Sequence, residues 1–154
     1  MAARFFAAIG WHGSGMLEHF VEAQEPIYQD ALAELRAGDK RTHWMWFIFP
    51  QLRGLGRSEH AIRYGLADLS EAKAYLAHTV LGPRLRECTH ALLAVEGKSA
   101  NEILHSPDDL KFRSSMTLFL HAAADPKPFR AALEKYYGGE LDPLTVELLG
   151  RDAP

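Results

Sequence analysis

Helix start and stop signals recur along this chain, and they constrain its fold more than any other feature. Pro is common in the first turn of a helix, where its missing N–H is not needed, and Gly is common just after the last turn. Between these signals, apolar residues return every three or four positions, and no segment alternates convincingly between apolar and polar residues. The pattern therefore predicts an all-α protein. The expected helices span residues 17–35 (divided or kinked at Pro26), 44–49, 59–66, 71–78, 83–95, 99–105, 107–123, 126–137 and 143–150.

Residues 44–49 are apolar on every face, so periodicity alone does not separate a buried helix from a buried strand there. A lone strand would leave its backbone groups unpaired, because no other segment reads as a strand. We therefore expect a short buried helix that ends before Pro50. The N-caps expected for this helix and for others are Thr42, Ser58, Ser70, Ser99 and Ser106.

Length and composition indicate a single domain. A chain of 154 residues can bury one core, and 47% hydrophobic and 24% charged residues are usual for a globular protein. We expect residues 16–150 to form a compact bundle of about seven to nine short helices with little or no sheet. Residues 1–15 are expected to be a disordered N-terminal extension from an upstream start codon, and residues 151–154 a tail.

Basic residues are concentrated in one part of an acidic chain. Residues 36–63 contain six Lys or Arg and two Asp or Glu, a net charge of +4, whereas the whole chain has a net charge of −3. Such a basic island suits a small anionic ligand better than a nucleic-acid polymer, which needs a longer basic stripe. The alternative is that these residues form solvated helix faces.

The turn at residues 54–58, Gly-Leu-Gly-Arg-Ser, is the candidate phosphate site within this island. Gly54 and Gly56 allow the backbone to approach a ligand closely, Arg57 supplies a guanidinium, and Ser58 opens a helix. The turn lacks the third glycine of a dinucleotide fingerprint and the lysine of a P-loop. An ordinary turn before a helix is therefore the alternative.

Several residues near the turn are candidate ligand contacts. Trp44 and Trp46 could stack on a base, although both would serve equally well as core residues. His43 and Gln51 stand at the two ends of the same aromatic run, and His43 has the alternative of a hydrogen-bonded core or rim residue. Glu59 is the candidate catalytic carboxylate, because it could orient water or a ribose hydroxyl, or it could simply favour the start of its helix.

A second polar group lies farther along the chain. Lys111 and Ser114 share a helix face opposite the apolar stripe, and they would join the site only if that face meets the Arg57 turn. Asp109 and Arg113, four residues apart, are expected to form a surface ion pair.

The remaining composition favours a reducing cytoplasm and no bound metal or cofactor. Cys88 cannot form an intramolecular disulfide, and it lies on the apolar stripe of its helix, so we expect a core residue rather than a nucleophile. No two histidines stand three or four residues apart, so no helical zinc pair is present. No segment has the roughly 18 apolar residues of a membrane span.

Four segments resemble the bacterial domain-of-unknown-function 1810 family: HWMWFIFPQ (43–51), GLGRS (54–58), LGPRL (81–85) and DDLKFRSSMTLF (108–119). The resemblance covers residues 17–150. It implies an all-α fold and no established activity.

A more distant resemblance connects the chain to the NADAR proteins, which are associated with NAD and ADP-ribose chemistry and with cleavage of N-glycosidic bonds. Ser58-Glu59-His60 is similar to their Ser-Glu-His element at a helix start, and Arg113 and Met116 fall where their Arg- and Met-bearing helix would stand. The tryptophan that those proteins carry between the two elements is missing here.

Two functions from different classes follow from these observations. The first is binding of a phosphate-bearing, ADP-ribose-like nucleotide, with hydrolysis of an N-glycosidic bond at Glu59. The alternative is a non-catalytic helical interaction domain, in which the aromatic run is core and the basic island contacts an acidic partner.

Overall fold

The computed structural model describes residues 11–152, and every regular element in that range is a helix. The prediction of an all-α protein is confirmed. Ten helices are present there, slightly more than expected. They are α2 (Trp11–Gln24), α3 (Tyr28–Ala37), α4 (Met45–Ile48), α5 (Glu59–Tyr64), α6 (Leu69–Ala77), α7 (Leu81–Ala94), α8 (Ala100–Leu104), α9 (Asp108–Ala122), α10 (Lys127–Tyr137) and α11 (Pro143–Asp152).

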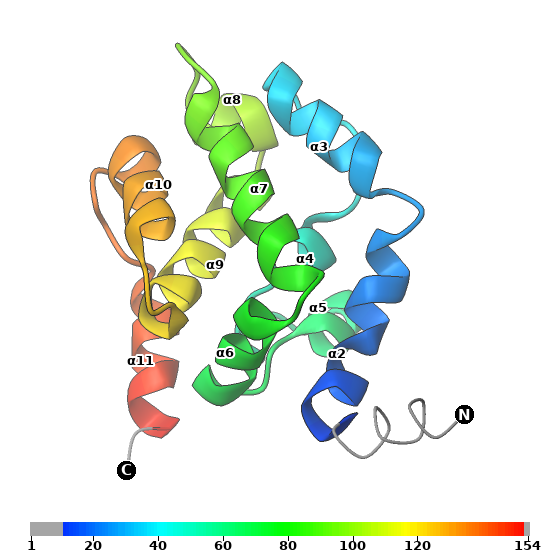
Figure 1. The fold of residues 1–154 in the computed structure, drawn as a ribbon. Helices are drawn as coiled ribbons and strands as arrows, with labels where there is room; N and C mark the ends of the chain where they lie inside the picture. Colours follow the sequence, from blue (N-terminus) through cyan, green and yellow to red (C-terminus); the bar gives the residue numbers. More distant parts are fainter. Residues whose placement is uncertain (1–10, 153–154) are drawn as a thin grey trace.

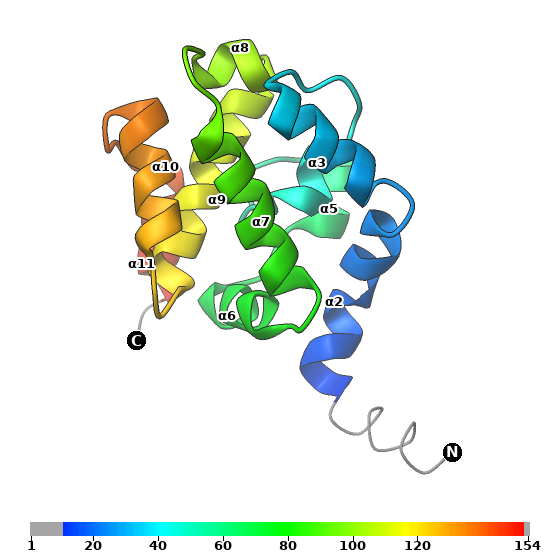
Figure 2. The ribbon, with the colours of Figure 1, turned by 45° about the horizontal axis from the view of Figure 1, so that its top comes forward.

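Helices α7 and α9 occupy the centre of the molecule, with α10 and α11 on one side and α2 and α3 on the other (Figure 1, Figure 2). Helix α9 packs against α4, α6, α8, α10 and α11, and α7 packs against α3, α4, α6 and α10. The short helices α4 and α5 lie between these central helices and α2. The segment with the candidate phosphate turn is therefore next to the core.

Pro26 separates the first two helices, and this break accounts for one of the additional elements. Helix α2 ends at Gln24 and α3 begins at Tyr28. Gly38 then ends α3 in the left-handed conformation, with φ at 70°, as expected of a glycine stop. Helix α2 begins at Trp11, whereas the first helix was expected to begin at residue 17, so the expected disorder of residues 11–15 is wrong. The rest of the expected N-terminal extension, residues 1–10, lies outside the described residues.

Some of the expected helix starts are correct and others are wrong. Ser58 and Ser99 cap α5 and α8, accepting hydrogen bonds from the N–H groups of residues three positions later. Thr42 does not cap α4, because its hydroxyl donates to Glu34 instead. Ser70 lies within α6, which Asp68 caps.

Two further starts also differ from expectation. Helix α7 begins at Leu81, so Pro83 occupies its third position rather than its first. Helix α9 begins at Asp108, with Pro107 rather than Ser106 at the N-cap position. In both helices Pro still lies at or beside the first turn, where its missing N–H is tolerated.

The hydrophobic core is built around one face of α9. Phe112, Met116 and Phe119 are fully buried there, as the expected stripe predicts. Cys88 of α7 is also fully buried, which confirms it as a core residue. Burying each large apolar side chain contributes about 1.5–3 kcal/mol to folding.

A short backbone pairing fixes the segment between α4 and α6. Leu52 and Leu66 form a parallel bridge, in which the Leu66 N–H donates to the Gln51 carbonyl at 2.9 Å. The Arg53 N–H donates to the Leu66 carbonyl at 2.7 Å. Gly65 is required at this crossing, because a Cβ there would lie 2.9 Å from the Cα of Arg53. Leu66 was expected to end α5, but this bridge takes it out of the helix, which stops at Tyr64.

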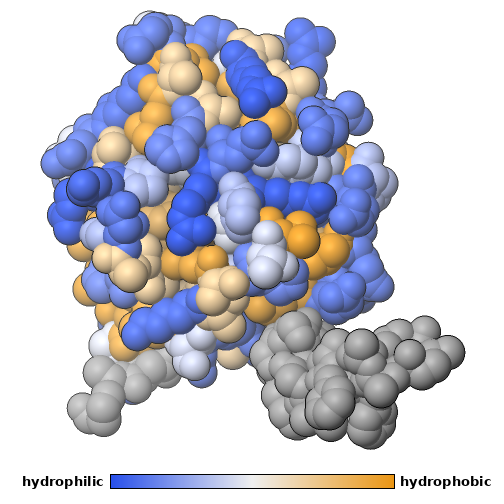
Figure 3. Space-filling view, in the orientation of Figure 1, coloured by the Kyte–Doolittle hydropathy of each residue, from blue (hydrophilic) through white to orange (hydrophobic). Residues whose placement is uncertain are grey.

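The surface around α7 is mainly hydrophilic, with apolar residues exposed in separate groups between hydrophilic ones (Figure 3). Among the described residues, no helix has the length and apolar character needed to cross a membrane.

Candidate functional site

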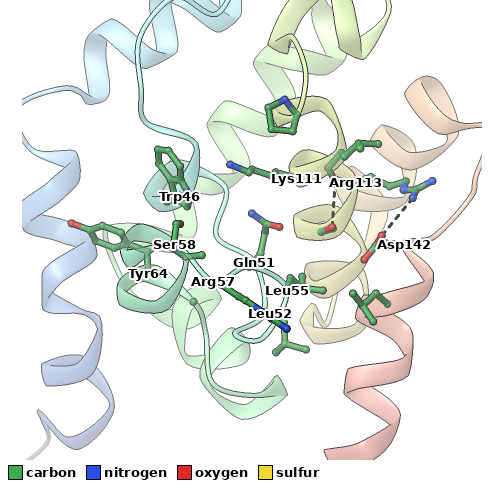
Figure 4. A pocket seen from close by; sticks show the side chains of 17 residues that line it. Trp46, Gln51, Leu52, Leu55, Arg57, Ser58, Tyr64, Lys111, Arg113 and Asp142 are labelled. Carbon is green, nitrogen blue, oxygen red and sulfur yellow. Dashed lines mark hydrogen bonds and ion pairs between the residues drawn. The ribbon is translucent and has the colours of Figure 1, made fainter.

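A cavity of about 470 Å³ opens between the α4–α5 segment and α9, with the start of α11 at its edge (Figure 4). This volume is typical of a small-molecule site. The α4–α5 wall comes from residues 46–65 and the opposite wall from residues 107–114, and residues 142 and 144 complete it.

The cavity brings together most of the residues that the sequence singled out. The polar face of α9 does meet the Arg57 turn, which is the condition under which that face would join the site. The expected residues in the wall are Trp46, Gln51, Gly56, Arg57, Ser58, Lys111 and Ser114.

Four expected residues lie outside the wall. Trp44 is buried in the core, and its indole N–H donates to the Glu34 carboxylate at 2.9 Å, so it has no face to offer a ligand. His43 and Gly54 are exposed, and neither contributes to the cavity. Glu59 is exposed in the first turn of α5 and is likewise absent from the wall.

Apolar residues that sequence reasoning missed form much of the remaining wall. Leu110 of α9 and Leu144 of α11 are 53% and 46% exposed, although both are large apolar side chains. Both line the cavity, together with Leu55 and Tyr64. Exposed apolar residues at the edge of a pocket are typical of a binding site. The sequence does not distinguish Leu110 and Leu144 from ordinary surface leucines, because both lie far along the chain from the Arg57 turn.

Lys111 and Trp46 face each other across the cavity. The Lys111 ammonium lies 4.4 Å from the Trp46 ring centroid, a cation–π contact between α9 and α4. Asp108 also lies 3.7 Å from this ammonium, but the same carboxylate is 2.9 Å from the buried ammonium of Lys40. Lys111 therefore shares its acidic partner and keeps part of its positive charge for the cavity.

Among the six basic residues of the island, Arg57 has the fewest contacts. Each of the other five basic residues of the island has a partner in the described structure: an acidic side chain for Arg36, Lys40 and Arg41, the Gly65 carbonyl for Arg53, and the Tyr64 ring for Arg63. Within residues 17–151, Arg57 has no ion-pair partner, and it lines the cavity. Its charge is available to an anion.

Arg113 is held at the edge of the site. The expected pair with Asp109 is wrong: Arg113 lies 3.5 Å from Asp142 and 3.8 Å from Glu140, because α11 and the loop before it pack against this face of α9. The Asp142 carboxylate also accepts hydrogen bonds from the N–H and hydroxyl of Thr145, at 3.0 and 2.6 Å. Asp142 is thus a structural carboxylate that fixes α11 and Arg113.

Aromatic rings continue from the cavity wall over α5. The Trp46 and His60 ring centroids are 4.8 Å apart, and those of His60 and Tyr64 are 6.1 Å apart. His60 is not part of the cavity wall, whereas Lys111 is, so the Trp46 face under Lys111 is the one that the cavity exposes. These contacts hold the indole ring in place from behind.

Comparison with known protein families identifies the family of this chain. A family described as "Protein of unknown function (DUF1810)" matches residues 14–149. The chain belongs to this family. The DUF1810 chain is also similar to a conserved hypothetical protein of Mycobacterium tuberculosis, Rv1873, whose crystal structure was solved at 1.38 Å.

The similarity to the M. tuberculosis protein is extensive. The two are 57% identical, the match covers 87% of this chain and 96% of that one, and the TM-score is 0.86. No curated protein matches the chain. The description of the family and the name of the M. tuberculosis protein mention neither a ligand nor a reaction.

The arrangement in this DUF1810 protein suits binding more directly than metal or carboxylate chemistry. Among the described residues, no group of three or more His, Cys, Asp or Glu side chains is placed to hold a metal ion. Asp142 is the one carboxylate in the described wall, and Arg113 and Thr145 already contact it. What the cavity offers is an aromatic face, apolar edges and two available cations.

Proposed function

We propose that this protein binds a phosphate-bearing small molecule with a flat ring, of the ADP-ribose or adenine-nucleotide type, in the cavity between α4–α5 and α9. One observation carries the proposal: Arg57, which has no ion-pair partner within residues 17–151, lines the same cavity as the aromatic face of Trp46. A guanidinium is suited to phosphate, and an indole ring to a flat heterocycle.

The contacts of Lys111 suggest how such a ligand would enter. Its ammonium covers the cavity-facing side of Trp46, so a ring that stacks there takes its place. The long lysine side chain can then turn toward the ligand's phosphate, on the opposite side of the cavity from Arg57. The Lys111 ammonium loses its cation–π contact with Trp46 in this exchange. It gains a hydrogen bond and charge pairing with the phosphate, which is the stronger interaction.

Phosphate binding in this proposal depends on side chains. Helix α5 has only six residues, and the Ser58 hydroxyl already accepts the Ala61 N–H at 3.1 Å. The turn expected to cradle a phosphate contributes Gly56, Arg57 and Ser58 to the wall but not Gly54. Arg57 and Lys111 are therefore the proposed phosphate contacts.

The resemblance of Ser58-Glu59-His60 to the NADAR element supports a ligand of the ADP-ribose type, and with it N-glycosidic hydrolysis. Developing positive charge on the sugar would need a nearby carboxylate. Glu59 lies next to Ser58 but outside the wall, so hydrolysis would require its side chain to turn toward the ligand. Binding is accordingly the main proposal, and turnover is a separate measurement.

A thermal-shift titration with ADP-ribose, NAD, AMP and inorganic phosphate tests the proposal. A ligand that binds only the folded protein raises its stability by about 2.7 kcal/mol at a hundredfold excess over Kd. We expect a rise with ADP-ribose and AMP that is lost in Arg57→Ala. Arg130→Ala is the matched control, since Arg130 is exposed on α10, away from the cavity.

Unchanged stability with all four compounds would refute the proposal and favour the helical interaction domain. The cavity favours the small-molecule function, because docking of a protein partner does not require a cavity beside Arg57.

A further inference from the structure

The backbone holds Gln51 at a fixed place in the cavity. Its carbonyl accepts the Leu66 N–H at 2.9 Å, and the bridge continues through Leu52. Leu52 is 3% exposed and packs in the core, although it also reaches the cavity wall. The Gln51 side chain is half-buried and lines the cavity, directed toward Trp46 and Lys111 (Figure 4).

The Gln51 amide is available to a ligand. Figure 4 shows it beside Trp46 and Lys111, with no hydrogen bond or ion pair to another side chain of the wall. Gln24 is a useful contrast. Its amide donates to the Phe47 carbonyl at 2.6 Å and to the Tyr75 hydroxyl at 3.1 Å. Gln24 thus has a structural role, and its amide is hydrogen-bonded within the protein. The Gln51 amide instead offers a donor and an acceptor to a ligand in the cavity.

We infer that Gln51 recognises the edge of an adenine ring that stacks on Trp46, an inference that rests on the proposed function. A glutamine amide pairs with adenine through two hydrogen bonds: its oxygen accepts from the exocyclic amino group, and its N–H donates to the neighbouring ring nitrogen. The amide lies beside Trp46, so the ring edge rather than its face meets Gln51.

Adenine and nicotinamide both offer a hydrogen-bond donor and an acceptor to Gln51, and the charge of the site distinguishes between them. The carboxamide of nicotinamide also offers one of each, but the nicotinamide ring of an oxidised nucleotide is positively charged. Lys111, whose ammonium a stacked ring displaces from Trp46, stays at the same end of the cavity and would repel a positively charged ring. Adenine is neutral and is therefore the preferred base.

Binding of three monophosphates to the wild-type protein tests the inference: AMP, purine riboside 5′-monophosphate and ribose 5-phosphate. The second compound keeps the ring and the phosphate and lacks only the exocyclic amino group. AMP is expected to bind about tenfold more tightly than it, since a site with a polar group for the ligand rejects an analogue that leaves that group unpaired. Nicotinamide mononucleotide is expected to bind more weakly than AMP.

The variant Gln51→Met keeps the length of the side chain and removes both hydrogen-bonding groups. It is expected to bind AMP and the purine riboside compound equally. Gln29→Met is the matched control, because Gln29 is exposed on α3 and should leave the tenfold preference unchanged. The wild-type comparison does not depend on whether the Gln51 variant folds.

Different results separate this inference from the proposed function. If the wild-type protein binds ribose 5-phosphate or the purine riboside compound as tightly as AMP, or if Gln51→Met retains the preference, the role of Gln51 is overturned while phosphate binding stands. If nicotinamide mononucleotide binds more tightly than AMP, the selection of adenine is overturned. If none of the four compounds binds, the proposed function itself fails.

Discussion

The Lys111 ammonium lies 4.4 Å from the centroid of the Trp46 ring, and this contact joins α9 to α4 across the cavity. The two residues are far apart in the sequence, and one supplies an aromatic face and the other a positive charge to the cavity wall. The contact also means that the Lys111 ammonium covers the aromatic face of the site. In the proposed function, ligand binding is therefore coupled to the position of Lys111.

Lys111→Met should weaken binding of AMP by about tenfold, because it removes a charged partner of the phosphate from a site that is partly open to solvent. Affinity measured at low and high salt checks the cause: the variant should show a weaker salt dependence than the wild-type protein. Lys127→Met, at an exposed position in α10, is the control. An unchanged salt dependence in the Lys111 variant would remove this residue from the phosphate site.

Glu59→Gln should leave the affinity for AMP within about twofold, because Glu59 lies outside the cavity wall. Isothermal titration of the variant beside Arg57→Ala checks this. If hydrolysis of ADP-ribose or NAD is detected in the wild-type protein, its loss in Glu59→Gln with affinity retained would assign the carboxylate to catalysis. Turnover that persists in Glu59→Gln would exclude that role.

Glu34→Gln should destabilise the protein by about 1–2 kcal/mol, because the carboxylate accepts hydrogen bonds from two backbone N–H groups, the Thr42 hydroxyl and the Trp44 indole. Burial opposes ionisation of Glu34, but these donors outweigh it and hold its pKa below the usual 4.5. A carboxyl group with a lowered pKa stabilises the fold above its unfolded-state pKa, and this stabilisation is lost as the pH falls through the folded-state value.

Urea unfolding at several pH values from 7 to 3 measures this effect. The wild-type protein should lose stability below about pH 4.5 more steeply than Glu34→Gln, which cannot ionise at this position. Parallel loss of stability in both proteins would show that other carboxylates dominate the acid response.

Two tryptophans show how far the sequence alone could predict the site. Trp44 and Trp46 are equivalent candidates in the sequence, but Trp44 is buried with its N–H on Glu34, while Trp46 lines the cavity. Which of them faces a ligand depends on a hydrogen bond to α3 that no local pattern encodes. The aromatic run itself, and its helix, follow from composition and the absence of strands.

Elsewhere in the fold and site, features that depend on neighbouring residues were also predictable, and features that depend on tertiary contacts were not. Local signals located Ser58 and Ser99 as caps and Gly38 as a stop, because these depend only on neighbouring residues. The ion pair of Arg113 was not predictable from α9 alone, since Asp142 approaches it from another part of the chain. Contacts across the tertiary structure, rather than helix propensity, determine which polar residues form the cavity.

Asp142→Ala should destabilise the protein by about 1–2 kcal/mol, because it removes the cap of α11 and the carboxylate that pairs with Arg113. Asp142→Asn should cost less, since an amide oxygen can still accept the Thr145 N–H. Thermal unfolding of the two variants provides the comparison. Equal losses of stability would mean that the charge of Asp142, rather than its cap, dominates.

Cys88 should resist thiol reagents in the folded protein. Burial raises the pKa of its thiol to about 12, so almost none of it is thiolate at pH 8, and its side chain is fully enclosed between the core helices. Reaction with a colorimetric disulfide reagent at pH 8 should therefore be slow in buffer and fast in denaturing urea. Glu34→Gln removes hydrogen bonds that do not involve Cys88, and it should react faster than the wild-type protein in proportion to its larger unfolded population. Rapid labelling of the folded wild-type protein would show that this part of α7 opens without global unfolding, and that Cys88 is accessible after all.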